Sequence, residues 1–452
     1  MNKKIFDGLK VGVIGLGRSG IAAANLVKKL GADVLVSEAR NIKDAAKSVK
    51  KLLKNVKQEF GGHTKKLLSQ DIIIKSPGIS SHLPILSKAI KNCIPVWSEI
   101  GLALRLIEPG CLVAITGTNG KTTTTTLIGE IFKAAKRDTI VAGNIGEPLA
   151  NVTDKVRSKT SVVLEISSYQ LEDTPEFRPN ISIILNITPD HMEHHGTMKK
   201  YTDAKAVVFK NQTKEDFCIL NYDDPVCRKL AQHCKAKVIF FSRKEKLQKG
   251  VYALDGKIHV NFGSHKYSFT PYLRIPGDHN MENALASTAA AAAAGIPREI
   301  IEEAIEDFRG VEHRIEFVAA IDGVKYVNDS KGTNVDSTRV ALISYNQPVW
   351  LILGGRDKGS PYAPLKQLIR EKVKGILLIG EAAPKIKKEL HGTTEFYHCL
   401  NIAGALKKAR ELSVSGDVVL LSPACASFDQ FKDYEERGRY FKKLVHKMRM
   451  RK

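Results

Sequence analysis

Short apolar runs rich in Val, Ile and Leu alternate with amphipathic segments along this chain, and most of the runs end at glycine or polar residues. A short buried run followed by a segment of helical period predicts a strand and then a helix. Repetition of this unit predicts parallel sheets covered by helices. Since the chain has 452 residues, it is too long for one hydrophobic core. We therefore predict the α/β fold class with three domains, at residues 1–99, 100–310 and 311–452.

The first block opens on a predicted strand, residues 11–14, which is followed by the glycine-rich turn 15–20 and an amphipathic helix. The next strand, residues 34–36, is closed by Glu38, which completes a G-x-G-x-x-G arrangement with a downstream acid. This arrangement predicts a diphosphate or another anion at the helix N-terminus, and NAD or FAD is its usual ligand. A second turn, residues 76–78, has on its residues alone the features of an ordinary turn.

The second block opens on strand 112–115 and continues into the turn 117–122, which contains two glycines, Lys121 and Thr122. Such a turn directs backbone N–H groups at one point, and the helix that follows adds partial positive charge. Lys121 suits the outer phosphates of a nucleoside triphosphate, and Thr122 suits Mg²⁺. Although Ile115 stands where the usual pattern has its first glycine, the turn predicts a phosphate-binding loop.

Two more strands of this block end near chemically useful side chains. Glu165 ends one strand, and the next strand, residues 181–187, is followed by His191. Since the carboxyl ends of parallel strands share one edge, the acid and the imidazole are candidate metal ligands facing the phosphate loop. We expect His194 and His195 in a solvated loop. Three histidines also suggest zinc, but no further Cys or His lies at suitable spacing.

The third block repeats the pattern with four predicted strands, at residues 324–327, 350–353, 376–379 and 418–421. Helical segments separate them, so we predict a parallel sheet. Polar and charged loops follow three of these strands, which makes the carboxyl edge of this sheet a second candidate ligand site.

Composition narrows the function classes. The formal net charge is +22, but the lysines are spread along surface-helix patterns without aromatic interleaving. This distribution favours anionic small substrates and leaves nucleic acid as a minor alternative. The seven cysteines form no C-x-x-C pair, which favours a reducing compartment. No apolar run reaches about 18 residues, so we expect no membrane insertion and a cytoplasmic location.

Several of these segments together resemble the Mur ligases, the ATP-dependent amide-bond-forming enzymes of bacterial peptidoglycan synthesis. The segments are the turn 117–122 and residues 142–146, 328–331, 421–431 and 437–438. The resemblance covers essentially the whole chain and implies a Rossmann-like N-terminal domain, a central sheet like that of P-loop ATPases, and a Rossmann-like C-terminal domain. Residues 421–431 favour the branch that adds D-glutamate to UDP-N-acetylmuramoyl-L-alanine through an acyl phosphate.

The resemblance also implies a set of site residues. The implied ATP contacts are Gly117, Thr118, Asn119, Gly120, Lys121, Thr122, Thr123, Asn280, Asn283, Arg314 and Asp329. The implied contacts to the UDP substrate are Arg18, Ser19, Glu38, Arg40, Ser76, Pro77, Gly78 and Asn144. The implied D-glutamate contacts are Lys331, Thr333, Lys358, Ser427 and Tyr434. Many family members carry Asp where this chain has Glu38, and Phe is frequent at the position of Tyr434.

The implied cofactors are ATP and two Mg²⁺ ions, the latter held by Thr122, Glu165, His191 and a carbamylated Lys205. On its residues alone Lys205 is a lysine of a surface helix, and only the resemblance raises it. The implied catalytic residues are Lys121, Glu165, His191, Lys205 and Asn144. We expect a monomer whose third domain closes over ATP.

Four alternatives stay open from the sequence. A sibling ligase that adds another amino acid or a dipeptide shares the central loop, and so does folylpolyglutamate synthetase, which lacks a glycine-rich N-terminal domain of this kind. An NAD-dependent oxidoreductase explains the turn 15–20 but not Lys121. A nucleotide-gated binding protein needs only the loop around Lys121 and predicts ATP binding without turnover.

Overall fold

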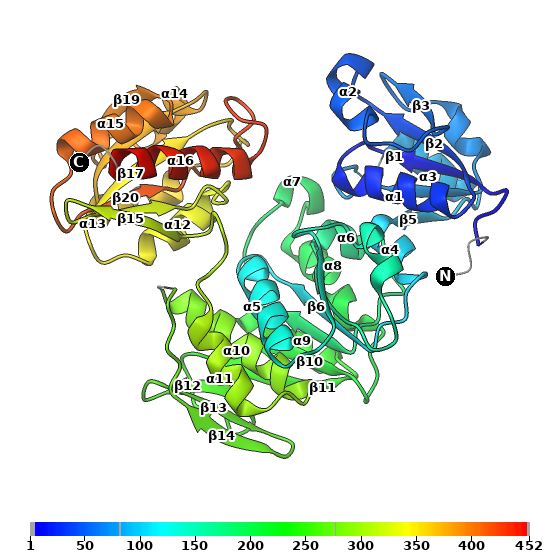
Figure 1. Ribbon diagram of the computed structural model, residues 1–452, viewed down its shortest axis with the longest axis horizontal. Coiled ribbons are helices and arrows are strands. Elements are labelled where there is room, and N and C mark those ends of the chain that lie inside the picture. The colour runs from blue at the N-terminus through cyan, green and yellow to red at the C-terminus, as the bar shows by residue number, and fades with distance from the viewer. Residues whose placement is uncertain (1–4, 81–82, 276, 450–452) are drawn as a thin grey trace. The chain divides into compact units, whose positions relative to one another are not determined.

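The structure is a computed structural model that describes residues 5–80, 83–275 and 277–449. Three mostly parallel sheets with flanking helices form the fold, which confirms the predicted α/β class (Figure 1). The chain divides into two compact units. Unit 1 comprises residues 1–272 and 281–307 and holds the first two sheets, and unit 2 comprises residues 273–280 and 308–452 and holds the third.

The first sheet is entirely parallel, with strand order β3-β2-β1-β4-β5. Its strands are β1 (Lys10–Ile14), β2 (Asp33–Glu38), β3 (Lys57–Phe60), β4 (Ile72–Lys75) and β5 (Val96–Ser98). The helices of this region are α1 (Arg18–Lys29), α2 (Ile42–Val49), η1 (Lys65–Ser69), α3 (Pro84–Lys91) and α4 (Glu99–Leu104). β1 lies at the centre because its apolar side chains are buried on both faces of the sheet, as is usual in parallel sheets.

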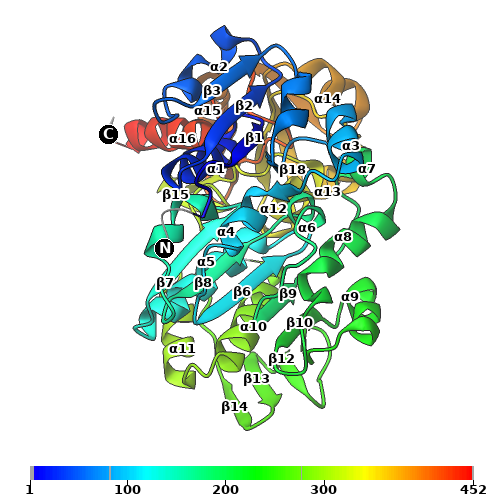
Figure 2. The same cartoon turned by 90° about the vertical axis from the view of Figure 1, so that its right-hand side faces the viewer.

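The second sheet has nine strands in the order β14-β13-β12-β11-β10-β9-β6-β8-β7, and Figure 2 shows most of them side by side. Its strands are β6 (Cys111–Thr116), β7 (Thr139–Gly143), β8 (Ser161–Glu165), β9 (Ile181–Ile184), β10 (Phe217–Asn221), β11 (Lys237–Ser242), β12 (Gly250–Leu254), β13 (Lys257–Phe262) and β14 (His265–Phe269). The pairing is parallel except for the antiparallel β12-β13-β14 edge, which was not predicted from the sequence.

Helices cover this sheet as well. They are α5 (Lys121–Ala134), η2 (Leu149–Asn151), η3 (Thr153–Lys155), α6 (Ser168–Glu172), α7 (Met192–His195), α8 (Met198–Lys210), α9 (Pro225–Leu230), η4 (Ala231–His233), α10 (Asp278–Ala293) and α11 (Arg298–Asp307). One hydrophobic core runs through the first sheet and into the second. The two sheets of unit 1 are therefore parts of one packed body.

One strand of unit 1 is shorter than predicted. The apolar run 181–187 is only in part a strand, because β9 ends at Ile184. Beyond it the chain turns to the phosphate loop, where the Asn186 carbonyl accepts a hydrogen bond from the Thr118 amide at 2.9 Å. The last residues of the run are therefore not part of the sheet, and Asn186 among them contacts the phosphate loop.

The third sheet has six strands in the order β15-β16-β20-β17-β18-β19. Its strands are β15 (Glu316–Ile321), β16 (Val324–Asn328), β17 (Val349–Gly354), β18 (Val373–Ile379), β19 (Glu395–Leu400) and β20 (Val418–Leu421). Its helices are α12 (Val335–Ile343), η5 (Ala363–Leu365), α13 (Lys366–Lys372), α14 (Ala383–Glu389), α15 (Ile402–Leu412) and α16 (Tyr434–Arg449). The four predicted strands are present and parallel, and β19 and the antiparallel β15 extend the sheet.

Within the described residues, none of the helices has the length and apolar character needed to cross a bilayer.

Candidate functional site

The phosphate loop joins β6 to α5, at the carboxyl edge of the second sheet. Gly120 caps α5 in the left-handed region at φ 85°, a conformation that glycine adopts at no steric cost. A Cβ at this position would lie 2.5 Å from Oδ1 of Asn283. The Asn283 side chain thus approaches the loop at a position where residue 120 has no side chain.

Hydrogen bonds from the turn after β9 fix the loop. The Asn119 amide donates to Oδ1 of Asn186 at 2.8 Å, and Thr118 Oγ1 accepts from the Thr188 amide at 3.0 Å. Nζ of Lys121 donates to the carbonyls of Gly117 and Thr118, at 2.9 and 2.7 Å. The predicted loop is thus rigidly held, with its lysine folded over it.

Four other residues predicted to contact ATP lie on α5 and α10. Thr122 is half-buried and Thr123 is buried in the first turn of α5. Asn283 is buried on α10 and accepts a hydrogen bond from Thr124 Oγ1 at 3.1 Å. Asn280 is buried one turn earlier on the same helix. The structure thus brings the Asn283 side chain to the first turn of α5, beside the phosphate loop.

Glu165, the last residue of β8, is buried. Its Oε1 accepts from Nδ2 of Asn144 at 2.8 Å, and the Asn144 amide donates to the Glu165 carbonyl at 2.9 Å. Its Oε2 is buried and has no hydrogen-bond partner among the described residues. A buried carboxylate oxygen without a partner is costly unless a cation satisfies it, so this donor set fits Mg²⁺.

Lys205 is not the surface lysine that the residues alone predict, because its side chain is 2% exposed on α8. Its Nζ donates to the Gly117 carbonyl at 2.8 Å and lies 4.6 Å from the ring centre of Tyr201. Burial and the neighbouring charge of Lys121 hold the pKa of Lys205 well below its usual range. The prediction of a solvated lysine is wrong because the helix turns this face inward, onto the phosphate loop.

A cavity of about 380 Å³ brings several predicted residues together. Its lining is Pro77, Gly78, Lys121, Asn144, Ser167, Ser168, Tyr169, His191, Tyr201 and Lys205. The loop that contains Pro77 and Gly78 follows β4 of the first sheet, and the other lining residues belong to the second-sheet region. The turn 76–78, ordinary on its residues alone, is therefore part of the cavity wall.

Four residues of this lining were not predicted from the sequence, namely Ser167, Ser168, Tyr169 and Tyr201. Tyr201 is buried, and its hydroxyl lies 3.1 Å from Oγ1 of Thr118. Its signal was present in the sequence, because Tyr201 precedes Lys205 by four residues and side chains at this spacing share a helix face.

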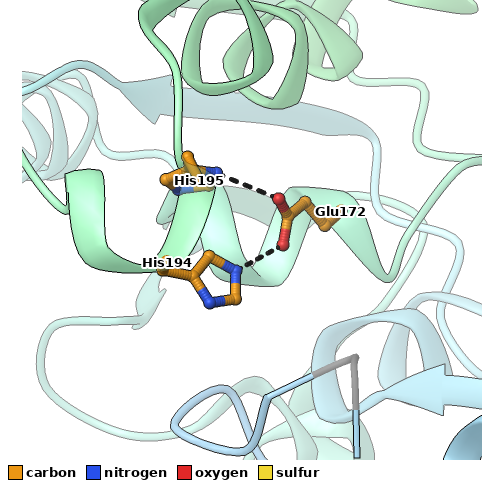
Figure 3. A group of neighbouring side chains, drawn as sticks. All are labelled: Glu172, His194 and His195. Atoms are coloured by element: carbon orange, nitrogen blue, oxygen red, sulfur yellow. Dashed lines mark hydrogen bonds and ion pairs between the residues drawn. The ribbon is translucent and has the colours of Figure 1, made fainter.

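The three histidines have different surroundings. His191 adopts a left-handed conformation at φ 55°, and its side chain is 43% exposed at the cavity. His195 has a completely buried side chain, and the side chain of His194 is 12% exposed. The expectation of a solvated loop for His194 and His195 is wrong, because both imidazoles turn toward Glu172 at the end of α6 (Figure 3).

The first glycine-rich turn is closed by an ion pair. Oε2 of Glu38 accepts from the Leu16 amide at 2.8 Å and from the Arg40 guanidinium at 3.0 Å. Burial alone would raise the pKa of Glu38, but the hydrogen bonds from the Arg40 side chain and from the Arg40 and Leu16 amides lower it to about 2. At neutral pH this carboxylate is ionised and holds the turn.

The other predicted residues of this region surround the same turn. Arg18 is exposed and Ser19 is half-buried at the start of α1. Ser76 is buried, and its Oγ donates to the Gly15 carbonyl at 3.2 Å. A Cβ at Gly20 would lie 1.9 Å from that carbonyl, so the glycine allows α1 to begin directly against the turn.

In unit 2, Asp329 directly follows β16, at the carboxyl edge of the third sheet, and is fully buried. Its carboxylate accepts from Ser422 Oγ at 2.7 Å and from the Ile315 amide at 3.2 Å, and Arg314 lies 3.6 Å away. Burial raises the pKa of Asp329, while Arg314 and these hydrogen bonds oppose the change. The carboxylate thus joins three segments of this edge.

The residues predicted for D-glutamate form two pairs in unit 2. Nζ of Lys358 donates to Thr333 Oγ1 at 3.2 Å, and Nζ of Lys331 lies 5.7 Å from the ring centre of Tyr434. Ser427 is buried in the loop after β20. This edge therefore presents two cationic side chains with hydroxyl and aromatic neighbours.

The sequence matches known protein families in the regions of all three sheets. Residues 9–98 match the family described as "Mur ligase MurD-like, N-terminal domain". Residues 115–291 match "Mur ligase middle domain", and residues 313–425 match "Mur ligase, glutamate ligase domain". Each of the three sheets therefore lies largely within one match.

Relatives resemble the chain over almost its full length. It is 45% identical over 445 residues to the UDP-N-acetylmuramoylalanine–D-glutamate ligase of Koribacter versatilis, covering 98% of both chains. It is 43% identical to the ligase of the same name from Clostridioides difficile, covering 98% of this chain and 99% of that one. Among solved structures, the UDP-N-acetylmuramate-alanine ligase MurC of Thermotoga maritima shares the fold, with a TM-score of 0.62 and 22% identity over 98% of this chain and 100% of that one. This protein therefore belongs to the Mur ligase family.

Proposed function

We propose that this chain is an ATP-dependent ligase that adds D-glutamate to UDP-N-acetylmuramoyl-L-alanine in the synthesis of peptidoglycan precursors. Its relatives with this name match it over nearly the full length. The observation that carries the mechanism is the cavity beside the phosphate loop, where Lys121, Asn144, His191 and Lys205 meet.

Phosphoryl transfer from ATP to a carboxylate brings two anions together, so the site must supply positive charge and placement. The loop amides and the N-terminus of α5 would bind the phosphates, and Lys121 would leave the loop carbonyls to contact the outer ones. Asn144, held by Glu165 at 2.8 Å, would orient the substrate carboxylate. The resulting acyl phosphate would be attacked by the amine of D-glutamate, with release of phosphate.

The orphaned oxygen of Glu165 supports a divalent cation at this point. Thr122 and Glu165 would hold one Mg²⁺, and His191 with a modified Lys205 would hold a second. Bound Mg²⁺ would neutralise phosphate charge as ATP and the acceptor approach. Oxygen ligands are the ones that this cation prefers.

We propose carbamylation of Lys205 because its environment suits the chemistry. A lysine adds CO₂ only through its neutral amine, and burial beside Lys121 lowers the pKa of Lys205 and so favours that form. The N–C bond forms as the amine attacks CO₂, and one proton leaves to water. The product is an anionic carbamate beside the phosphate loop, where the lysine itself would only add positive charge.

The outer parts of the substrates would be bound elsewhere. Glu38, Arg40, Arg18 and Ser19 would contact the uridine diphosphate at the first turn, with the loop 76–78 nearby. In unit 2, Lys331 and Lys358 would bind the two carboxylates of D-glutamate, as cationic side chains do, with Thr333, Ser427 and Tyr434 around them. Arg314 and Asp329 would contact ATP.

The proposal also covers the domain boundaries, the oligomeric state and the location of the protein. We propose domains at 1–99, 100–310 and 311–452, a monomer, and action in the cytoplasm. All seven cysteines are free thiols in the structure, which supports a reducing compartment.

The decisive experiment measures phosphate release from Mg-ATP with UDP-N-acetylmuramoyl-L-alanine and one amino acid at a time. We expect turnover with D-glutamate and none with L-glutamate, L-alanine or meso-diaminopimelate. Turnover with another of these would keep the ligase mechanism and reassign the amino-acid pocket. Absence of turnover with all of them would overturn the proposal.

A further inference from the structure

Beside the cavity, Glu172, His194 and His195 form a group of metal-ligand side chains that the proposed reaction does not use (Figure 3). Glu172 ends α6, and the two histidines end α7. One ligand atom from each residue lies within 4.8 Å of the others. The sequence offers no further Cys or His at a spacing suited to zinc, but the third ligand is a carboxylate that folding brings from 22 residues away.

The distances are close to those that a metal ion requires. Nε2 of His194 lies 2.8 Å from one Glu172 oxygen, and Nδ1 of His195 lies 3.0 Å from the other. A tetrahedral ion with bonds of 2.0–2.1 Å keeps its ligand atoms about 3.3 Å apart. Small side-chain rotations would therefore open the group around an ion without moving a helix.

The buried histidine is arranged as a metal-binding imidazole usually is. Its Nδ1 is buried and has no aligned hydrogen-bond partner among the described residues, although Glu172 is near. Its Nε2 lies 3.0 Å from Ser168 Oγ, and metal-binding histidines typically use the second nitrogen for such a bond.

We propose that Glu172, His194 and His195 bind a divalent transition-metal ion, with Zn²⁺ as the favoured ion. Two imidazoles and one carboxylate select such an ion over Mg²⁺, which prefers oxygen ligands. The Glu172 side chain is 29% exposed, which gives water access to complete the coordination. The ion would link α6 to α7, the helix that begins directly after His191. This inference is independent of the proposed ligase activity.

The test is a titration of the full chain, stripped of metal by a chelator, with Zn²⁺ in the presence of excess Mg²⁺. Calorimetry measures affinity and stoichiometry, and Co²⁺ in place of Zn²⁺ reports the ligands through its visible absorption. The variants are His194→Gln and Glu172→Gln, which are less buried than His195. The matched control is His233→Gln, an exposed histidine of η4, and His191→Gln reports on the cavity.

We expect one Zn²⁺ per chain, with affinity at least about 100-fold weaker in His194→Gln and Glu172→Gln, since even outer partners of metal ligands contribute 10–100-fold. The control should bind as the unchanged chain does. Circular dichroism without metal checks that the variants fold. If they do not fold, anomalous diffraction at the zinc absorption edge from crystals of the unchanged chain locates the ion. Binding that survives both substitutions, binding lost only in His191→Gln, or no binding at all would each overturn the proposal.

Discussion

The two glycine-rich turns of unit 1 occupy the same place in their sheets and differ in what surrounds them. Each follows a strand that pairs in parallel on both sides, β1 or β6, and precedes a helix. At the first turn the Glu38 carboxylate accepts from the Leu16 amide and pairs with Arg40. At the second turn Lys121 folds onto the loop, and Lys205 donates to the Gly117 carbonyl from α8.

The surroundings of the first turn suit binding of an anion, whereas those of the second turn suit a reaction at an anion. Both turns have helix N-termini that suit phosphates, so the backbone alone does not distinguish them. The second turn adds Lys121, whose charge suits phosphoryl transfer, the buried Lys205, for which we propose carbamylation, and a Glu165 oxygen without a partner among the described residues, which a cation would satisfy. Five substitutions test whether the two turns differ in function in this way.

The largest effect is expected for Lys121→Ala. Removal of its charge should lower kcat/KM for phosphate release about 1,000-fold, as loss of one preorganised transition-state contact does. The control is Lys133→Ala, an exposed lysine near the end of the same helix. Near-normal turnover in Lys121→Ala would remove the distinction between the turns.

A second substitution, Lys205→Ala, should lower turnover about 100-fold, on the scale of losing a group that supports a metal ion. Small carboxylates such as acetate should restore part of the rate, because they replace the anionic carbamate. Lys210→Ala, on the same helix and exposed, serves as the control. Full activity of Lys205→Ala would show that this buried lysine has no part in the reaction.

At the first turn we expect a loss of binding instead of a loss of chemistry. Arg18→Ala and Arg40→Ala should each raise KM for the UDP substrate about tenfold, the value of one hydrogen bond to a charged group, with kcat little changed. Steady-state kinetics at saturating ATP measures this, and Lys29→Ala at the far end of α1 is the control. A fall in kcat with constant KM would contradict the assignment.

The smallest effect is on stability and concerns Glu38→Gln. Since folding lowers the pKa of Glu38 from 4.5 to about 2, the ionised carboxylate stabilises the fold above pH 4.5, and this contribution is lost as pH falls toward 2. The unchanged chain should therefore have the higher free energy of unfolding at neutral pH, and the difference should shrink on acidification. Urea unfolding across this range checks it, and a difference independent of pH would reject the ion-pair explanation.

Local pattern predicted the parts of this protein that depend on neighbours in sequence. The turn 117–122 was recognisable because its glycines, lysine and helix start are contiguous, and the strands β1, β6 and β8 because buried parallel strands are continuous apolar runs. The β12-β13-β14 edge was missed because its strands are half-buried and carry mixed polar residues. The run 181–187 was assigned too long because burial at the phosphate loop has the same apolar signature as burial in a strand.

The sequence by itself thus determined the α/β class, the phosphate loop and the family of this protein, since these reside in contiguous residues and their order. Only the tertiary structure decided which side chains meet. It buried Lys205 against the Gly117 carbonyl, left one oxygen of Glu165 without a partner among the described residues, and brought Glu172 to His194 and His195. The physical reason is that burial and charge pairing depend on which helix faces pack together, and residues far apart in the chain share in that packing.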